Sequence, residues 1–400
     1  MIAAIAGPGL ISAIADNDAG GITTYSIVGA HFGYTLLWAI FVTTFILAIT
    51  QEMGARLGVV TGKGLAALIR EHFGVRLTVF AMVVMMVANL GTIASEFAGI
   101  AASFELVGLS RFIVVPVCAI IVWLVLYKGS FKMSERVFLS FTLFYLVYII
   151  SCFAVRPDWA VALRSLVVPS FSFNSAYLFA LIALIGTTIT PWGQFFIQSY
   201  VVDKGLSVKE YRYEKIEVFF GAFLTNLISF FIIITTANTL FAGGIHITSA
   251  YDAALALKPI VGNFAQILFA VGLFAASLLG AFILPTATSY AVCEAFGWEN
   301  GFDRTWKEAK AFYGFILFLI ASGALLVLIP HISLIKIMLF AQGANGVLLP
   351  IILFYLMRLV NSKELMGRYT NNRLYNIIAW GSIIGIIGVT IVLVVSSILQ

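Results

Sequence analysis

The chain has 400 residues, of which 62% are hydrophobic and only 10% are charged. A water-soluble domain of this length could not bury so much apolar surface, so the composition excludes a soluble globular protein. The net charge of +5 does not indicate a nucleic-acid partner, because the basic residues fall in the predicted loops between apolar segments.

Repeated apolar runs of about 20 residues predict an all-α polytopic membrane protein whose partner is the lipid bilayer. A membrane barrel is excluded, because its strands are short segments of alternating polarity. The oligomeric state stays open, and a monomer is compatible with the sequence. We predict eleven spans, near residues 4–31, 34–59, 77–104, 111–127, 132–154, 175–202, 216–242, 259–295, 311–329, 332–358 and 374–398.

The loop charges predict the orientation in a bacterial inner membrane. Eighteen Lys and Arg residues fall on one side of the predicted spans and four on the other, namely Arg111, Arg156, Arg164 and Lys258. The richer side is expected to be cytoplasmic, which puts the N-terminus inside and the C-terminus outside. No cleavable signal peptide is predicted, since Met1–Leu10 lacks a basic start; whether the native N-terminus is trimmed stays open.

The first span carries two acids at its centre, in the segment Asp16-Asn17-Asp18. A charged side chain at this depth costs about 2.5–3.5 kcal/mol on insertion scales, so packing alone does not explain two of them. Gly20 and Gly21 follow and let the backbone leave helical geometry. The pattern predicts a broken helix that binds a partly dehydrated cation; the alternative is a polar kink paired with another helix.

Two further acids lie in the second and third spans. Glu52 precedes Arg56 by four residues, which predicts a local ion pair on one helix face. Glu96 lies deep in the third span, where it is a proton relay or a structural partner. The structural role is favoured, since no chain of titratable neighbours accompanies it. The three cysteines, Cys118, Cys152 and Cys293, are far apart and are predicted to be packing residues.

The sixth span is interrupted by the segment Gly186–Gly193, in which Pro191 removes a backbone donor and three threonines supply hydroxyls. This predicts a second broken helix, five spans after the first, although an ordinary proline kink has the same signal. Because five is odd, the two halves would have opposite orientations. We therefore predict one transporter domain over 1–400, with inverted five-helix repeats over 1–154 and 175–358 and an additional helix over 374–398.

The two breaks together offer only oxygen ligands. The predicted metal ligands are Asp18, Asp16, Thr187, Thr190 and Gly21, with the backbone carbonyls of both breaks. Carboxylate, carbonyl and water oxygens suit Mg²⁺ and Mn²⁺, whereas softer metals favour sulfur. Asn17 is predicted to hold waters. Gln342 and Asn345 share a helix face in the tenth span, where they either line the aqueous path or bond neighbouring helices.

At these residues the chain resembles the Nramp family of divalent-metal transporters. The resemblance covers Gly7–Ala15, the break at Asp18, Gly33–Trp38, Thr61–Lys63 and the stretch from Gln342 to Pro350, and so nearly the whole chain. It implies a LeuT-like fold, with spans 1 and 6 broken at mid-membrane around a metal site.

The chain departs from the family pattern at the site itself. Where the family has Asp-Pro-Gly-Asn, the aspartate matches Asp18, but Ala19 and Gly21 replace proline and asparagine. The family's Met-Pro-His is Thr190-Pro191-Trp192, and the carbonyl used upstream of that methionine matches Thr187. Family acids for proton passage fall on Met86 and Ile93. This pattern is most like that of the Nramp-related magnesium transporters.

The sequence hypothesis is therefore a secondary transporter that imports hydrated Mg²⁺, and also Mn²⁺, by alternating access and without proton coupling. The metal is a transported substrate, and no cofactor is expected. The nearest alternative is a proton-coupled Mn²⁺/Fe²⁺ importer of the general Nramp type. A sodium-coupled carrier of organic solutes and a receptor without flux are the other hypotheses. An enzyme is not expected, because no nucleotide-binding loop or nucleophile–base pair is present in the sequence.

Overall fold

The computed structural model describes residues 16–128, 146–302 and 304–399, and the elements in these ranges are helices. Short 3₁₀ or π turns extend several of them, including the π turn Ala237–Phe241 after α11. The bounds are α2 Ala19–Phe32, α3 Leu37–Thr61, α4 Leu65–Glu105, α5 Arg111–Tyr127, α7 Leu146–Ala154, α8 Trp159–Val167, α9 Ser175–Thr188, α10 Pro191–Asp203, α11 Tyr211–Thr236, α12 Ala250–Ala254, α13 Lys258–Val261, α14 Ala265–Phe296, α15 Lys310–Val327, α16 Leu334–Val360, α17 Lys363–Met366 and α18 Arg373–Leu399.

Most predicted spans have a counterpart among these helices. Within the described residues, eight helical segments are long and apolar enough to cross a membrane, with α9 and α10 forming one of them. The shorter apolar helix Arg111–Tyr127 coincides with the fourth predicted span. The first half of the first span and residues 132–145 of the fifth span lie outside the described residues, as do residues 7–15 of the family resemblance.

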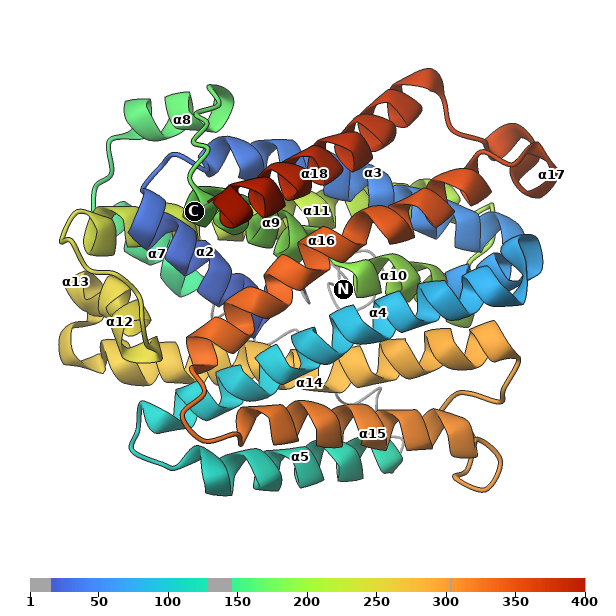
Figure 1. Cartoon of the computed structure of the whole chain (residues 1–400), viewed down its shortest axis with the longest axis horizontal. Helices are drawn as coiled ribbons and strands as arrows, with labels where there is room; N and C mark the ends of the chain where they lie inside the picture. Colours follow the sequence, from blue (N-terminus) through green and yellow to red (C-terminus); the bar gives the residue numbers. More distant parts are fainter. Residues whose placement is uncertain (1–15, 129–145, 303, 400) are drawn as a thin grey trace.

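The helices pack in a bundle whose long members run close to one another (Figure 1). Helix α4 packs along α14, and α15 and α5 cover that pair on one side. Helix α16 runs beside α4 and packs on α9, while α18 lies along α16. Only 17% of the apolar window of α18 is buried inside the protein, so its surface is suited to face lipid.

The third span differs from its prediction at its beginning. The sequence places this start near residue 77, but α4 begins at Leu65 and is broken at Gly74, whose φ of +75° is not helical. The segment before Gly74 is amphipathic: Leu65, Leu68 and Ile69 are buried, while Arg70 is exposed. A hydropathy criterion misses such a helix because only one face is apolar. The short helices α8, α12 and α17 lie outside the predicted spans because they are too short to cross a membrane. Helix α13 overlaps the beginning of the eighth predicted span, 259–295, but the long helix α14 begins only at Ala265.

Glycines allow α9 and α16 to approach closely beside the break in the sixth span. A Cβ at Gly186 would lie 2.2 Å from the backbone nitrogen of Gly346, and a Cβ at Gly346 would lie 2.3 Å from the carbonyl oxygen of Ile182. Small residues at such contacts are how membrane helices gain packing without a hydrophobic driving force between them.

We expect Gly346→Ala to lower the free energy of unfolding by about 1–3 kcal/mol, because the added methyl group overlaps backbone atoms of α9 that cannot rotate away. The measurement is unfolding of the purified protein in detergent. Gly385→Ala in α18 is the matched control, since a Cβ there meets nothing within 4 Å. Equal stability of the two variants would contradict this close contact.

Candidate functional site

Helix α2 begins in the protein interior, directly after the acids of the predicted first break; the part of the first span before Asp16 lies outside the described residues. Asp18 is the N-cap of α2, and its Oδ1 accepts a hydrogen bond of 2.6 Å from the backbone N–H of Gly21. Asp16, Asn17 and Asp18 are buried, with exposed fractions of 1%, 1% and 3%. A helix N-terminus stabilises negative charge, so the helix itself makes this place suitable for a carboxylate at depth.

The sixth span is broken where the sequence predicts it. Helix α9 ends at Thr188 and α10 begins at Pro191, so Ile189 and Thr190 are the residues between them. Thr190 is extended and caps α10, since its Oγ1 accepts from the N–H of Gly193 at 3.3 Å. Pro191 takes the first helical position, where its missing N–H costs nothing.

Asp16 joins the two breaks. Its Oδ1 accepts a hydrogen bond of 3.2 Å from Thr190 Oγ1, and its Oδ2 accepts one of 3.3 Å from Gln51 Nε2 of α3. Two predicted ligands from segments 174 residues apart are therefore in direct contact. Gln51 was not predicted from the sequence, because a lone buried amide has no motif around it.

Asp18 and Thr187 converge at Gly21. A Cβ at Gly21 would lie 2.9 Å from the backbone oxygen of Asp16, 3.4 Å from Asp18 Oδ1 and 3.4 Å from Thr187 Oγ1. The missing side chain thus leaves a small space lined by a carbonyl, a carboxylate and a hydroxyl. In the part of the chain that the structure describes, the buried Thr187 hydroxyl has no hydrogen-bond partner. A buried hydroxyl is rarely left unsatisfied, so its position indicates a ligand site.

The side chain of Asn17 forms hydrogen bonds with α11. Its Nδ2 donates to Thr225 Oγ1 at 2.5 Å, and its Oδ1 accepts from Ser229 Oγ at 3.3 Å. These bonds fix the break against a neighbouring helix. The predicted role of Asn17 in holding waters stays a prediction.

The two amides of the tenth span, Gln342 and Asn345, have different surroundings. The sequence left open whether they line the aqueous path or bond neighbouring helices. Asn345 donates to Thr92 Oγ1 of α4 and to Gln342 Oε1, both at 2.9 Å, and so bonds neighbouring helices. Gln342 Nε2 points toward the first break, where a Cβ at Gly20 would lie 1.9 Å from it. Among the described residues this amide nitrogen has no hydrogen-bond partner. Gln342 is therefore at the site, with Asn345 behind it.

Glu96 of α4 lies at the beginning of α2. Its Oε2 accepts from the backbone N–H of Ala19 at 3.4 Å, so its carboxyl group is next to Asp18, the N-cap of that helix. A Cβ at Gly280 of α14 would lie 2.5 Å from Glu96 Cδ, so that glycine makes room for it. The favoured structural role rested on the absence of titratable neighbours, and the fold supplies one from another span. Met86 and Ile93 are apolar packing residues.

The candidate metal ligands carry little negative charge, and no sulfur atom is present at the break between α9 and α10. Within residues 16–128, 146–302 and 304–399, no three His, Cys, Asp or Glu side chains are arranged to hold a metal ion. A bound cation would therefore take its remaining ligands from hydroxyl, amide and carbonyl oxygens and from water, as hard divalent ions do. Elsewhere, the predicted Glu52–Arg56 ion pair is confirmed at 3.1 Å, and the three cysteines are free and buried.

The described helices form an all-helical membrane bundle in which the beginning of α2 meets the break between α9 and α10 at buried carboxylates. This arrangement resembles the architecture of LeuT-like transporters. The solved structure of Mhp1, a nucleobase-cation-symport-1 family transporter, has this fold with a TM-score of 0.57 and 14% identity, over 94% of this chain and 81% of that chain. The manganese transporter of Eremococcus coleocola is closer in fold, with a TM-score of 0.81 and 22% identity, over 98% of this chain and 86% of that one.

The family model of natural resistance-associated macrophage protein-like (Nramp) proteins matches residues 9–396, so the chain belongs to the Nramp family. The divalent metal cation transporter MntH of Yersinia enterocolitica is 29% identical, with 98% of this chain and 94% of the relative covered. That of Ralstonia nicotianae is 28% identical, with 94% and 87% covered. The chain is an integral membrane protein of a transporter family and not an enzyme.

We expect Thr187→Val and Thr188→Val to differ in their effect on stability. Thr188 Oγ1 bonds Leu184 O at 2.8 Å and Tyr25 OH at 2.9 Å, so its loss should lower the free energy of unfolding by about 1 kcal/mol. Thr187→Val removes an unpartnered hydroxyl and should leave stability unchanged or raised. Unfolding in detergent measures both. A destabilised Thr187→Val would mean that the hydroxyl has a structural partner.

Proposed function

We propose that the protein imports divalent metal cations by alternating access, with the ion bound between the two broken helices. The convergence of Asp16, Asp18 and Thr187 around the side-chain-free Gly21 carries this proposal. Asp18 and Asp16 supply the negative charge, and Thr187 and Thr190 supply hydroxyl oxygens. Gln342 contributes an amide that can orient a metal-bound water. Membership of the Nramp family and relatives named divalent metal cation transporters support the substrate class.

Mn²⁺ is the proposed principal substrate, and Mg²⁺ is proposed as a second one. Both ions accept carboxylate, carbonyl and water oxygens, which are the donors of this site. Mn²⁺ takes precedence because a solved structure of the same fold is a manganese transporter and the relatives share the name MntH. The preference for Mg²⁺ inferred from the sequence has no support in these relatives; it depends on the substituted site residues, namely Ala19, Gly21, Thr190 and Trp192.

The position of Glu96 favours the alternative hypothesis, in which metal import is coupled to a proton. Glu96 accepts a hydrogen bond from the N–H of Ala19, which puts another buried carboxyl group beside Asp18 at the beginning of α2. Two carboxyl groups that share a buried site favour one proton between them. A divalent ion that binds Asp18 competes with that proton, so metal binding would release it or pass it to Glu96. We therefore propose that import of the ion is accompanied by a proton. The membrane potential also favours entry, by about 4.6 kcal/mol per 100 mV for two charges.

The orientation and the internal symmetry are proposals of the same kind. The excess of Lys and Arg on one side supports a cytoplasmic N-terminus and an extracellular C-terminus. The breaks before α2 and between α9 and α10 support inverted repeats over 1–154 and 175–358, followed by the additional helix 374–398.

Uptake into proteoliposomes tests the function. We expect wild-type protein to accumulate Mn²⁺ and to acidify the lumen, as reported by a trapped pH-sensitive dye. Asp18→Asn should lower Mn²⁺ uptake more than tenfold, because it removes charge while its amide oxygen can still cap α2. Glu96→Gln should abolish acidification. Unchanged uptake by Asp18→Asn would remove Asp18 from the site, and Mn²⁺ uptake at constant pH would contradict proton coupling.

A change at Thr190 tests the origin of ion selectivity. We expect Thr190→Met to raise uptake of Cd²⁺ relative to Mg²⁺ by about tenfold, since a thioether prefers the softer ion. Thr190→Leu is the matched control, with similar bulk and no sulfur, and should lose uptake of both ions. If Thr190→Leu and Thr190→Met have the same Cd²⁺ to Mg²⁺ ratio, the side chain at Thr190 does not contact the ion.

A further inference from the structure

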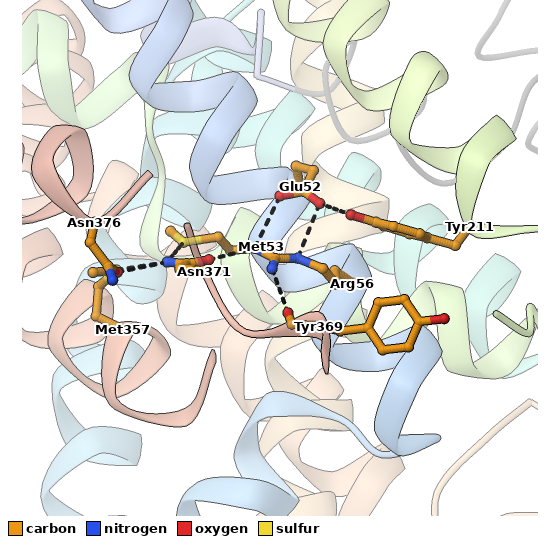
Figure 2. Close-up of polar contacts among 8 residues, drawn as sticks. All are labelled: Glu52, Met53, Arg56, Tyr211, Met357, Tyr369, Asn371 and Asn376. Atoms are coloured by element: carbon orange, nitrogen blue, oxygen red, sulfur yellow. Dashed lines mark hydrogen bonds and ion pairs between the residues drawn. The ribbon is translucent and has the colours of Figure 1, made fainter. Parts of the chain in front are cut away.

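The beginnings of α11 and α18 meet at one corner on the Lys- and Arg-rich side of the bundle. Arg56 of α3 donates to the carbonyl oxygen of Tyr369 and to Asn371 Oδ1, both at 2.5 Å, and pairs with Glu52. Tyr211 donates to the same Glu52 carboxylate, and its ring lies 6.3 Å from that of Tyr369 (Figure 2). The segment before α18 is thus held firmly against α3 and α11.

Lys215 is the unusual cation of this corner. Its Nζ lies 5.7 Å from the ring centroid of Tyr375 and 5.9 Å from that of Phe219, within cation–π distance of both. In the described part of the chain, no carboxylate forms an ion pair with Lys215, whereas Arg56 pairs with Glu52 and Lys63 with Glu71. The aromatic rings orient this ammonium group without neutralising it.

Further exposed cations lie on α11 and on the segment that leads into α18. Arg212 is exposed one turn earlier on α11, and Arg368 and Arg373 are exposed on either side of the segment that leads into α18. Arg368 packs on the ring of Tyr369 at 5.1 Å. The two acids nearest to Lys215 on α11 do not neutralise this positive charge. Glu214 is buried, and both Glu214 and Glu217 have interactions of their own. The corner therefore attracts an anion.

An exposed apolar stripe begins on α11 beside these cations, one turn beyond Arg212 on the same side of the helix. Ile216, Phe220 and Phe223, at positions i, i+4 and i+7, are 61%, 57% and 58% exposed. Along α11, about two helical turns, or about 10 Å, separate the cationic residues from the middle of the apolar stripe. An anionic phospholipid has this order of groups, with a phosphate at the interface and acyl chains below it.

We propose that Lys215, with Arg212 and Arg373 around it, binds the phosphate of an anionic phospholipid whose acyl chains lie on Ile216, Phe220 and Phe223. The bonds of Arg56 hold the two helix beginnings together, so the site exists before the lipid arrives. Binding at this corner does not depend on the proposed transport activity.

Native mass spectrometry of the full-length protein tests the proposal, with phosphatidylglycerol and phosphatidylcholine of identical acyl chains as probes. The wild type should bind phosphatidylglycerol more tightly than phosphatidylcholine. Lys215→Gln should weaken phosphatidylglycerol binding about fivefold, equivalent to about 1 kcal/mol, and leave phosphatidylcholine binding unchanged. Lys215→Arg should retain the preference.

The matched control is Lys310→Gln, which removes one exposed charge from the beginning of another helix, α15. It should bind phosphatidylglycerol like the wild type. Equal loss in both variants would mean a general surface charge effect and would overturn the site. If the wild type binds inorganic phosphate but shows no preference between the two lipids, the corner binds a free anion. If a dimer mass is present in the wild type and lost in Lys215→Gln, the corner binds a second copy of the chain.

Discussion

Burial of carboxylates at interrupted helices is the constraint on which the rest of the structure depends. In the bilayer interior, every polar backbone group and every charge needs a partner inside the protein. Asp18 uses the N-terminus of α2, Thr190 caps α10, and Asp16 is bonded from α3 and α10 at once. Each break is therefore completed by another element, and neither could persist alone.

The surrounding helices position these breaks through polar contacts that are not part of the metal ligand set. Thr225 and Ser229 of α11 hold Asn17, and Gln51 of α3 holds Asp16. The next residue along α3, Glu52, belongs to the network with Arg56 and Tyr211 at the charged end of the bundle. Helices α3 and α11 thus connect the site to the surface where α18 begins.

The chemistry of the site follows from what the breaks leave unsatisfied. Thr187 Oγ1 and Gln342 Nε2 are buried without a partner among the described residues, and both lie at the backbone of α2 near Gly20 and Gly21. Two carboxylates with hydroxyl and amide neighbours make a site of limited charge, which fits an ion that keeps some of its water. Glu96 adds a third buried acid at the beginning of α2, where it accepts from the N–H of Ala19.

The sequence by itself determined the membrane class, most spans and the break in the sixth span, because apolar length and proline position are local signals. It also predicted the pairing of Glu52 with Arg56, which needs only helical spacing. Tertiary structure alone decided that Asp16 bonds Thr190, that Glu96 accepts from the backbone of Ala19, and that Asn17 is held by α11. These contacts join spans that are 77 to 212 residues apart, and the distance between such segments is set by helix packing, which hydropathy and spacing do not encode.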